Sequence, residues 1–166
     1  LDDADLSLSD DRCAPRDQRL ADGIDESAPL DFYSPYGCSK GAADQYTCDY
    51  GRIYGLKTVT LRMSCIYGPR QFGTEDQGWI AHFMRRAAER QTISIYGDGR
   101  QVRDALHVDD AVRAWLAAFD RAGELRGRAF NLGGGPRNTI SLRELLARLD
   151  RGSAPSVVYQ GARPGD

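Results

Sequence analysis

The sequence has few lysines, no basic cluster and no long apolar run. Only two of its 22 basic residues, Lys40 and Lys57, are lysines, and the arginines are spread along the chain. This distribution does not indicate a nucleic-acid partner. No apolar run approaches the roughly 20 residues that cross a bilayer. The acidic N-terminal stretch also lacks the basic and apolar regions of a signal peptide. We therefore expect neither a nucleic-acid partner nor a membrane segment.

Residues that bind metals or form disulfides are also scarce. The two histidines, His82 and His107, lie far apart without a pattern typical of metal ligands, so we predict no metal site. The cysteines show no CxxC spacing and are typical of reduced thiols in a cytoplasmic protein. They are Cys13, Cys38, Cys48 and Cys65.

The composition is that of a globular protein. The chain has 166 residues, 41% of them hydrophobic and 28% charged, with a net charge of -2. A single domain of this length buries roughly 70% of the surface of its unfolded chain. Residues 1–30 are polar and aperiodic, so we interpret them as an irregular acidic insertion, which is long for a structureless loop in a compact domain.

Strand and helix patterns alternate from residue 34 onwards. Strands alternating with helices predict an α/β fold with a largely parallel sheet. Asp98 and Gly99 are typical of a hairpin turn, Asp109 is the expected helix cap, and Ser141 with Glu144 forms a capping box. The expected helices span 34–54, 78–90, 107–119 and 141–149, and the expected strands span 57–63, two short runs within 92–108, 128–132 and 157–160.

Tyr36 and Lys40 stand four residues apart at the start of the first expected helix. Residues at this spacing share one helix face. An ammonium ion beside a phenol favours the phenolate, which would make Tyr36 a general acid/base near neutral pH. The alternative is a surface pair near a helix start, and the YxxxK spacing alone does not separate the two.

Two further stretches could contact a ligand. The turn after 61–67 would lie at the carboxyl edge of a parallel sheet, where ligands of open α/β folds bind. The alternative is a turn that only connects two elements of secondary structure. Arg103 could clamp a phosphate through its planar guanidinium. The alternative is a surface arginine paired with Asp104 or Asp98.

Two stretches near the end of the chain also carry candidate groups. Arg163 and Asp166 offer a cation and an acid that could contact phosphate and ribose, or they are simply solvated. Residues 131–138 (NLGGGPRN) resemble a dinucleotide-binding turn, but Asn138 occupies the position of the third glycine of GxGxxG. We therefore interpret this stretch as a connection rather than a cofactor site.

Four segments, in this order, resemble the extended short-chain dehydrogenase/reductase superfamily, in particular the NAD-dependent nucleotide-sugar epimerases and dehydratases. The likeness runs from about Asp25 to the end of the chain, and SPYGCSKGAADQY with QFGTEDQGW resembles the branch that epimerises CDP-linked dideoxyhexoses at C2. The segments are LDFYSPYGCSKGAADQY (30–46), YGPRQFGTEDQGW (67–79), GDGRQVRDALHVDD (97–110) and FNLGGG (130–135).

The resemblance implies the C-terminal part of a Rossmann-like fold with a small α/β substrate-binding region. Residues 31–75 would belong to the NAD-binding domain, and 76–166 mainly to the region that binds the sugar nucleotide. The implied cofactor is NAD, the implied substrate a nucleotide-diphosphate sugar, and the implied assembly a homodimer.

The resemblance also implies roles for individual residues. Cys65 stands where many members have an asparagine that contacts the bound ligands, so that contact is in question here. The implied roles are catalytic acid/base for Tyr36, nicotinamide-ribose binding for Lys40, cofactor contact for Cys65, substrate contact for Gln77 and Trp79, diphosphate binding for Arg103, and phosphate and ribose contacts for Arg163 and Asp166.

The implied reaction is transient oxidation of the sugar to a ketone followed by reduction from the other face. A UDP-sugar 4-epimerase, an NDP-hexose 4,6-dehydratase and a non-catalytic sugar-nucleotide-binding fragment are the alternatives. The family's glycine-rich turn and catalytic Ser or Thr do not appear upstream of Tyr36, and its last helices do not follow Asp166. We therefore expect a fragment or a natural truncation, and we expect the 166-residue chain not to retain NAD.

Overall fold

The computed structural model describes residues 23–150 and 155–162. The predicted roles of Arg163 and Asp166 lie outside these residues. Residues 23–33 form turns and irregular backbone. The elements that follow are α1 (Pro35–Tyr54), β1 (Val59–Met63), β2 (Cys65–Tyr67), α2 (Trp79–Ala88), β3 (Ile93–Tyr96), β4 (Val102–His107), α3 (Val108–Asp120), β5 (Arg128–Leu132), the 3-10 helix η2 (Pro136–Asn138), β6 (Thr139–Ser141), α4 (Leu142–Leu149) and β7 (Val157–Gln160).

The ends of α1 follow from local sequence. The Ser34 hydroxyl accepts a hydrogen bond from the Gly37 N–H at 3.0 Å, and Pro35 occupies the first turn, where its missing N–H costs nothing. The helix ends at Gly55, whose φ of 73° is in the left-handed region that glycine adopts readily. The predicted helix is confirmed.

The strands pair mainly in parallel, which confirms the predicted α/β class. Parallel pairs join β1 with β5, β2 with β4, and β3 with β7, whereas β4 and β6 pair antiparallel. The expected strand at 57–63 is followed, after Ser64, by a second strand with a different partner. The chain therefore passes from the β1–β5 sheet to the β2–β4–β6 sheet at this residue.

Two local expectations are wrong. Asp98 and Gly99 do not close a hairpin, because β3 pairs with β7 while β4 pairs with β2 and β6. The cap of α3 is His107 rather than Asp109: the His107 ring nitrogen Nδ1 accepts a hydrogen bond from the Asp109 N–H at 3.2 Å. The capping box of α4 is confirmed, since Ser141 and Glu144 bond each other's backbone N–H groups.

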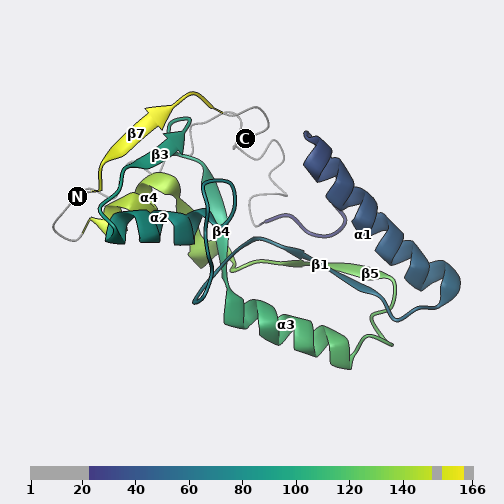
Figure 1. Ribbon diagram of the computed structural model, residues 1–166. Coiled ribbons are helices and arrows are strands. Elements are labelled where there is room, and N and C mark those ends of the chain that lie inside the picture. The colour runs from purple at the N-terminus through teal and green to yellow at the C-terminus, as the bar shows by residue number, and fades with distance from the viewer. Residues whose placement is uncertain (1–22, 151–154, 163–166) are drawn as a thin grey trace.

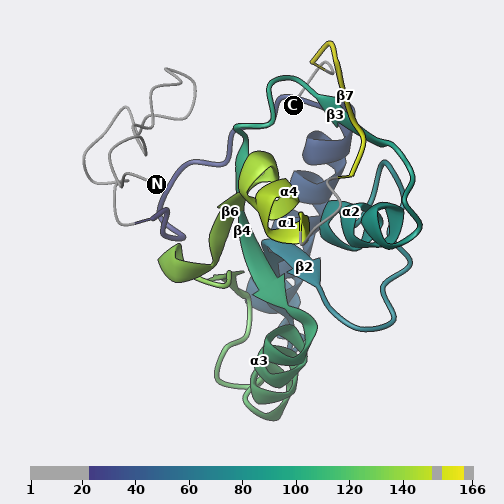
Figure 2. The same cartoon turned by 90° about the vertical axis from the view of Figure 1, so that its left-hand side faces the viewer.

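The elements form two groups. In Figure 1, α1 and α3 lie on opposite sides of β1 and β5, while α2 and α4 lie with β3 and β7. Figure 2 shows α3 at the far end of β4 from α4. Although β5 and α3 come from 76–166, both pack against β1, and β5 also contacts α1.

The hydrophobic core lies in the second group, between α2, α4 and the strands. Ile93 and Ile95 of β3 are fully buried there. Among the residues described, no helix is long and apolar enough to span a bilayer. The core members are Ile80, Phe83, Ile93, Ile95, Ala105, Ile140, Leu145 and Leu146.

Candidate functional site

Tyr36 and Lys40 meet on one face of the first turns of α1. The Lys40 Nζ lies over the Tyr36 ring, 5.4 Å from the ring centroid, at a distance typical of a cation–π contact. The Tyr36 side chain is 64% exposed. Within the described residues, neither side chain makes a hydrogen bond or ion pair. The phenol is therefore accessible to a ligand, with a cation beside it.

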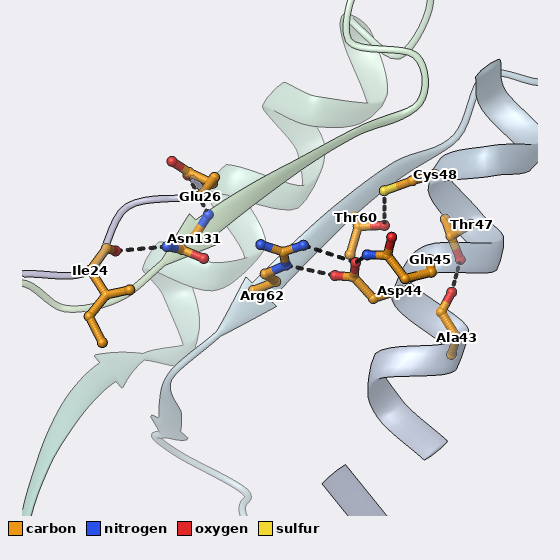
Figure 3. A network of polar contacts seen from close by, with 10 residues as sticks. All are labelled: Ile24, Glu26, Ala43, Asp44, Gln45, Thr47, Cys48, Thr60, Arg62 and Asn131. Atoms are coloured by element: carbon orange, nitrogen blue, oxygen red, sulfur yellow. Dashed lines mark hydrogen bonds and ion pairs between the residues drawn. The ribbon is translucent and has the colours of Figure 1, made fainter. Parts of the chain in front are cut away.

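A fork of two hydrogen bonds ties α1 to β1. The Arg62 Nε donates to Asp44 Oδ2 at 2.7 Å, and the Nη2 donates to Oδ1 at 2.9 Å (Figure 3). The two side chains are only 23% and 9% exposed. Hydrogen bonds from the guanidinium lower the pKa of Asp44, and the same bonds raise the pKa of Arg62.

Close packing fixes both ends of α1. A Cβ at Gly41 would lie 2.1 Å from the Phe32 ring, so a larger residue would displace that ring. A Cβ at Gly51 would lie 2.5 Å from the Gly127 Cα and 2.4 Å from the Thr58 hydroxyl oxygen. The helix therefore approaches the irregular segment at one end and the backbone beside β1 and β5 at the other.

The turn after β2 lies at the carboxyl edge of two parallel strands, as predicted. Cys65 is half-buried at the start of β2, opposite Ala105 of β4, and the Ser64 hydroxyl before it is buried without a hydrogen-bond partner in the described structure. The Gln71 amide donates to the Ile66 carbonyl at 3.0 Å and holds the turn. A cavity of about 190 Å³ is lined by Ile66, Tyr67, Gly68, Pro69, Arg70, Gln71 and Val108.

Arg103 is exposed on β4 and lacks the carboxylate partner that the alternative interpretation required. Its Nη1 donates only to the Val102 carbonyl at 3.3 Å, and the described residues place no acid in an ion pair with it. Asp104 instead accepts the Gly134 N–H at 2.7 Å, and Asp98 accepts the Arg100 N–H at 2.9 Å. The Arg103 guanidinium is thus available to an anionic ligand.

Gln77 and Trp79 lie on either side of the start of α2. Gln77 is exposed, and its N–H donates to the Thr74 hydroxyl at 3.3 Å. The Trp79 indole packs edge-to-face on Phe83, with ring centroids 5.8 Å apart, and its buried Nε1 has no partner among the described residues. The structure thus packs Trp79 against the core, and its contact with substrate stays a prediction.

The triglycine turn after β5, residues 133–135, is occupied by the carboxylate of Asp104. The Gly134 N–H, which a phosphate would need, already donates to the Asp104 carboxylate. A Cβ at Gly133 would lie 2.0 Å from an oxygen of the same carboxylate. A negative charge at this place repels a phosphate, so the turn does not fit the diphosphate of NAD. The exposed Tyr36 phenol with the Lys40 ammonium group beside it is chemically suited to the hydroxyls of a ribose, and its contact with the cofactor stays a prediction.

A family model described as "NAD dependent epimerase/dehydratase family" matches residues 9–133. The chain belongs to this family. Its fold is accordingly the Rossmann-like α/β fold of the solved epimerases and dehydratases. The resemblance recognised in the sequence is confirmed.

Individual relatives support the same assignment. The chain is 50% identical to CDP-paratose 2-epimerase of Salmonella typhi over 77% of its own length and 39% of that protein. It is 35% identical to dTDP-glucose 4,6-dehydratase of an Actinoplanes species, over 84% of this chain and 42% of that protein. The crystal structure of UDP-glucose 4-epimerase of Thermus thermophilus with NAD matches with a TM-score of 0.74 and 33% identity, over 86% and 46% of the two chains. The chain therefore spans less than half the length of these relatives.

The sequence did not point to Arg62 or Asp44 as part of the site. A signal was nevertheless present, because Asp44 lies in the stripe of α1 that buries Gly41, Cys48 and Gly51. A carboxylate in a buried helix stripe needs a cationic partner.

Proposed function

We propose that the protein is an NAD-dependent nucleotide-sugar epimerase that inverts C2 of a CDP-linked dideoxyhexose, with CDP-paratose as the first candidate substrate. The placement of Lys40 over the exposed ring of Tyr36 carries the catalytic part of this proposal. The 50% identity to CDP-paratose 2-epimerase supports the choice of reaction and nucleotide.

In this mechanism Tyr36 handles the proton. Its hydroxyl oxygen would take the proton from the hydroxyl at C2 as that carbon is oxidised to a ketone. Bound NAD supplies hydride transfer in both directions. The keto sugar would then rotate in the site so that its other face is reduced, and the Tyr36 phenol would return its proton to the oxygen. Lys40 places its charge beside the Tyr36 ring and holds the nicotinamide ribose.

The sugar nucleotide would lie along β4 and the turn after β2. Arg103 faces its diphosphate, since a guanidinium binds phosphate through paired hydrogen bonds. Gln77 and Trp79 contact the substrate, and Cys65 lies near the cofactor. Under this proposal 31–75 contributes to the cofactor-binding region and 76–166 mainly to the substrate-binding region. We also propose Arg163 and Asp166 as phosphate and ribose contacts.

A UDP-sugar 4-epimerase or an NDP-hexose 4,6-dehydratase is the second candidate. It is supported by the 35% identity to dTDP-glucose 4,6-dehydratase. A sugar-nucleotide-binding chain without catalysis is the third, since the one glycine-rich turn that resembles a dinucleotide site is closed by Asp104.

A cytoplasmic homodimer with a role in carbohydrate biosynthesis completes the proposal. Cys38, Cys48 and Cys65 are free thiols, as a reducing compartment would leave them. The outer face of α1 exposes Tyr46 and Ile53, each at 69%, and supplies apolar surface for a second copy. Sedimentation of the purified protein tests the dimer.

The reaction is tested by incubating the full-length protein with CDP-paratose and NAD and following the sugar protons by NMR. We expect inversion at C2 and no other change. In parallel incubations, inversion at C4 of a UDP-sugar or loss of water from an NDP-hexose would favour the second candidate. Mass spectrometry of co-purified small molecules gives an independent answer, with a CDP-hexose expected.

A further inference from the structure

Tyr36 and Lys40 cannot set their own positions. Both side chains are exposed, and in the part of the chain that the structure describes neither makes a hydrogen bond or ion pair that would hold it in place. Their place relative to a ligand therefore follows from where α1 lies. A displacement of about 1 Å at a reacting group can cost on the order of 100-fold in rate.

Several contacts hold α1, among them the weak hydrogen bond between Cys48 and Thr60, and they differ in what they fix. Gly51 against Gly127 and Gly41 against Phe32 set how closely the helix approaches its neighbours. Such packing tolerates small slides and rotations, because it has no directional component. The fork from Arg62 to Asp44 is directional, since both oxygens of the carboxylate meet the planar guanidinium.

Asp44 is well placed to transmit this constraint. It stands one helical turn after Lys40 and two turns after Tyr36, so a rotation of the helix at Asp44 moves both side chains. Lys40 and Asp44 are an i, i+4 pair, like Tyr36 and Lys40. Asp44 is also the only one of the three that is not exposed, since its side chain is 9% accessible.

Arg62 is itself held firmly. It lies within β1, in register with Asn131 of β5. The Asn131 N–H donates to the Glu26 carboxylate at 2.6 Å, and its side-chain amide donates to the Ile24 carbonyl at 2.8 Å (Figure 3). The strand pair and segment 24–26 thus form a frame to which the fork attaches α1.

We infer that Arg62 is a positioning residue for the epimerase reaction and that, through Asp44, it sets the place of Tyr36 and Lys40. This inference rests on the proposed function. Arg62 does not touch the reacting atoms in this account. It acts by fixing the rotation and register of α1 against β1.

The kinetic test compares two matched aspartates of α1 in the full-length protein. Asp44→Asn weakens the fork, whereas Asp49→Asn removes an exposed ion pair to Arg52 within the same helix. We expect Asp44→Asn and Arg62→Lys to lower kcat by roughly 10- to 100-fold with KM changed less than about threefold, and Asp49→Asn to leave both within about twofold. Equal kcat values for all of these variants and the wild type would overturn the inference.

The double variant Asp44→Leu/Arg62→Met distinguishes a positioning role of the fork from a purely stabilising one. Replacing a buried ion pair with apolar residues often leaves stability unchanged or raised. We expect this variant to unfold at a urea concentration near that of the wild type while its kcat stays low. Wild-type stability together with wild-type kcat would show that the fork only stabilises the helix and would refute the inference.

A third measurement does not depend on activity. NMR of the protein reports the contact between the side chains of Cys48 on α1 and Thr60 on β1, and hydrogen exchange reports the protection of α1. We expect Arg62→Lys to weaken that contact and raise exchange in the first turns of α1, with Asp49→Asn as the unchanged control. If the wild type proves inactive, the proposed function fails, and this comparison alone decides whether Arg62 positions the pair.

Discussion

Gly51→Ala should destabilise the protein because α1 lies directly against backbone at this position. The added Cβ would lie 2.4 Å from the Thr58 hydroxyl oxygen and 2.5 and 2.6 Å from the Cα and N atoms of Gly127. Ordinary contacts are about 3.5–4.0 Å, so α1 must retreat by about 1 Å. Gly127 cannot easily give way, since its φ is 69° and its N–H donates to the Thr58 carbonyl at 2.8 Å.

Two opposing terms set the size of the effect. Alanine is favoured over glycine inside a helix by about 1 kcal/mol. Overpacking costs about 1–3 kcal/mol, and the upper part of that range applies here because the obstacle is backbone. The expected net loss is about 1–2 kcal/mol of unfolding free energy. With a urea m-value of about 2 kcal/mol/M, the unfolding midpoint should fall by about 0.5–1 M.

The assay is urea unfolding followed by circular dichroism, with Gly123→Ala as control. A Cβ at Gly123 would meet only the Lys57 side chain, at 4.0 Å. Gly123→Ala should therefore be neutral or stabilising by up to about 1 kcal/mol. If Gly51→Ala unfolds at the same urea concentration as the wild type or higher, α1 does not lie where we place it.

Three further perturbations probe other parts of the structure. Arg62 lowers the pKa of Asp44 below 3.8. The Asp44–Arg62 ion pair therefore stabilises the folded protein above that pH, and this stabilisation is lost as the pH falls through the lowered pKa of the folded state. Asp44→Asn should lower the unfolding free energy by about 1–3 kcal/mol at neutral pH, and this difference from the wild type should shrink in acid. A difference that stays constant with pH would contradict this explanation. Ser141→Ala removes the cap hydrogen bond to the Glu144 N–H and should cost about 1 kcal/mol in thermal or urea unfolding, with no loss if the box is absent. Burial lowers the pKa of His82 below 6.5, so the stability of the wild type should decline as pH falls below that value. The stability of His82→Gln should change less between about pH 7 and 5. Parallel stability profiles for the two proteins would rule out His82 as the cause.

The helices could be predicted where their ends carry local signals. Ser34 and Gly55 bound α1, and the Ser141–Glu144 box starts α4, because each of these motifs acts within a few residues. The start of α3 was misassigned because Asp109 is a common cap, whereas the structure uses the His107 ring.

Strand partners could not be predicted in the same way. Asp98 and Gly99 permit a tight turn, but they do not determine which strand lies beside β3. That choice depends on β7, about 60 residues later in the chain, which pairs with β3 where Ile93 and Ile95 enter the core. Long-range packing therefore overrides the local hairpin signal.

The residues of the candidate site also differ in whether the sequence could reveal them. Tyr36 and Lys40 were found because helical periodicity places them on one face. Arg62 and Asp44 lie on different elements 18 residues apart, and only the fold brings them together. The availability of Arg103 likewise depends on Gly134, which engages the neighbouring Asp104.

The most direct test of the proposed chemistry is the turnover of CDP-paratose by Tyr36→Phe in the full-length protein, with sugar-nucleotide affinity measured alongside. General acid/base catalysis contributes about 10²- to 10⁴-fold, so we expect kcat to fall by at least about 100-fold while the Kd for CDP-paratose stays within about threefold. A rate within about tenfold of the wild type would show that another group moves the proton.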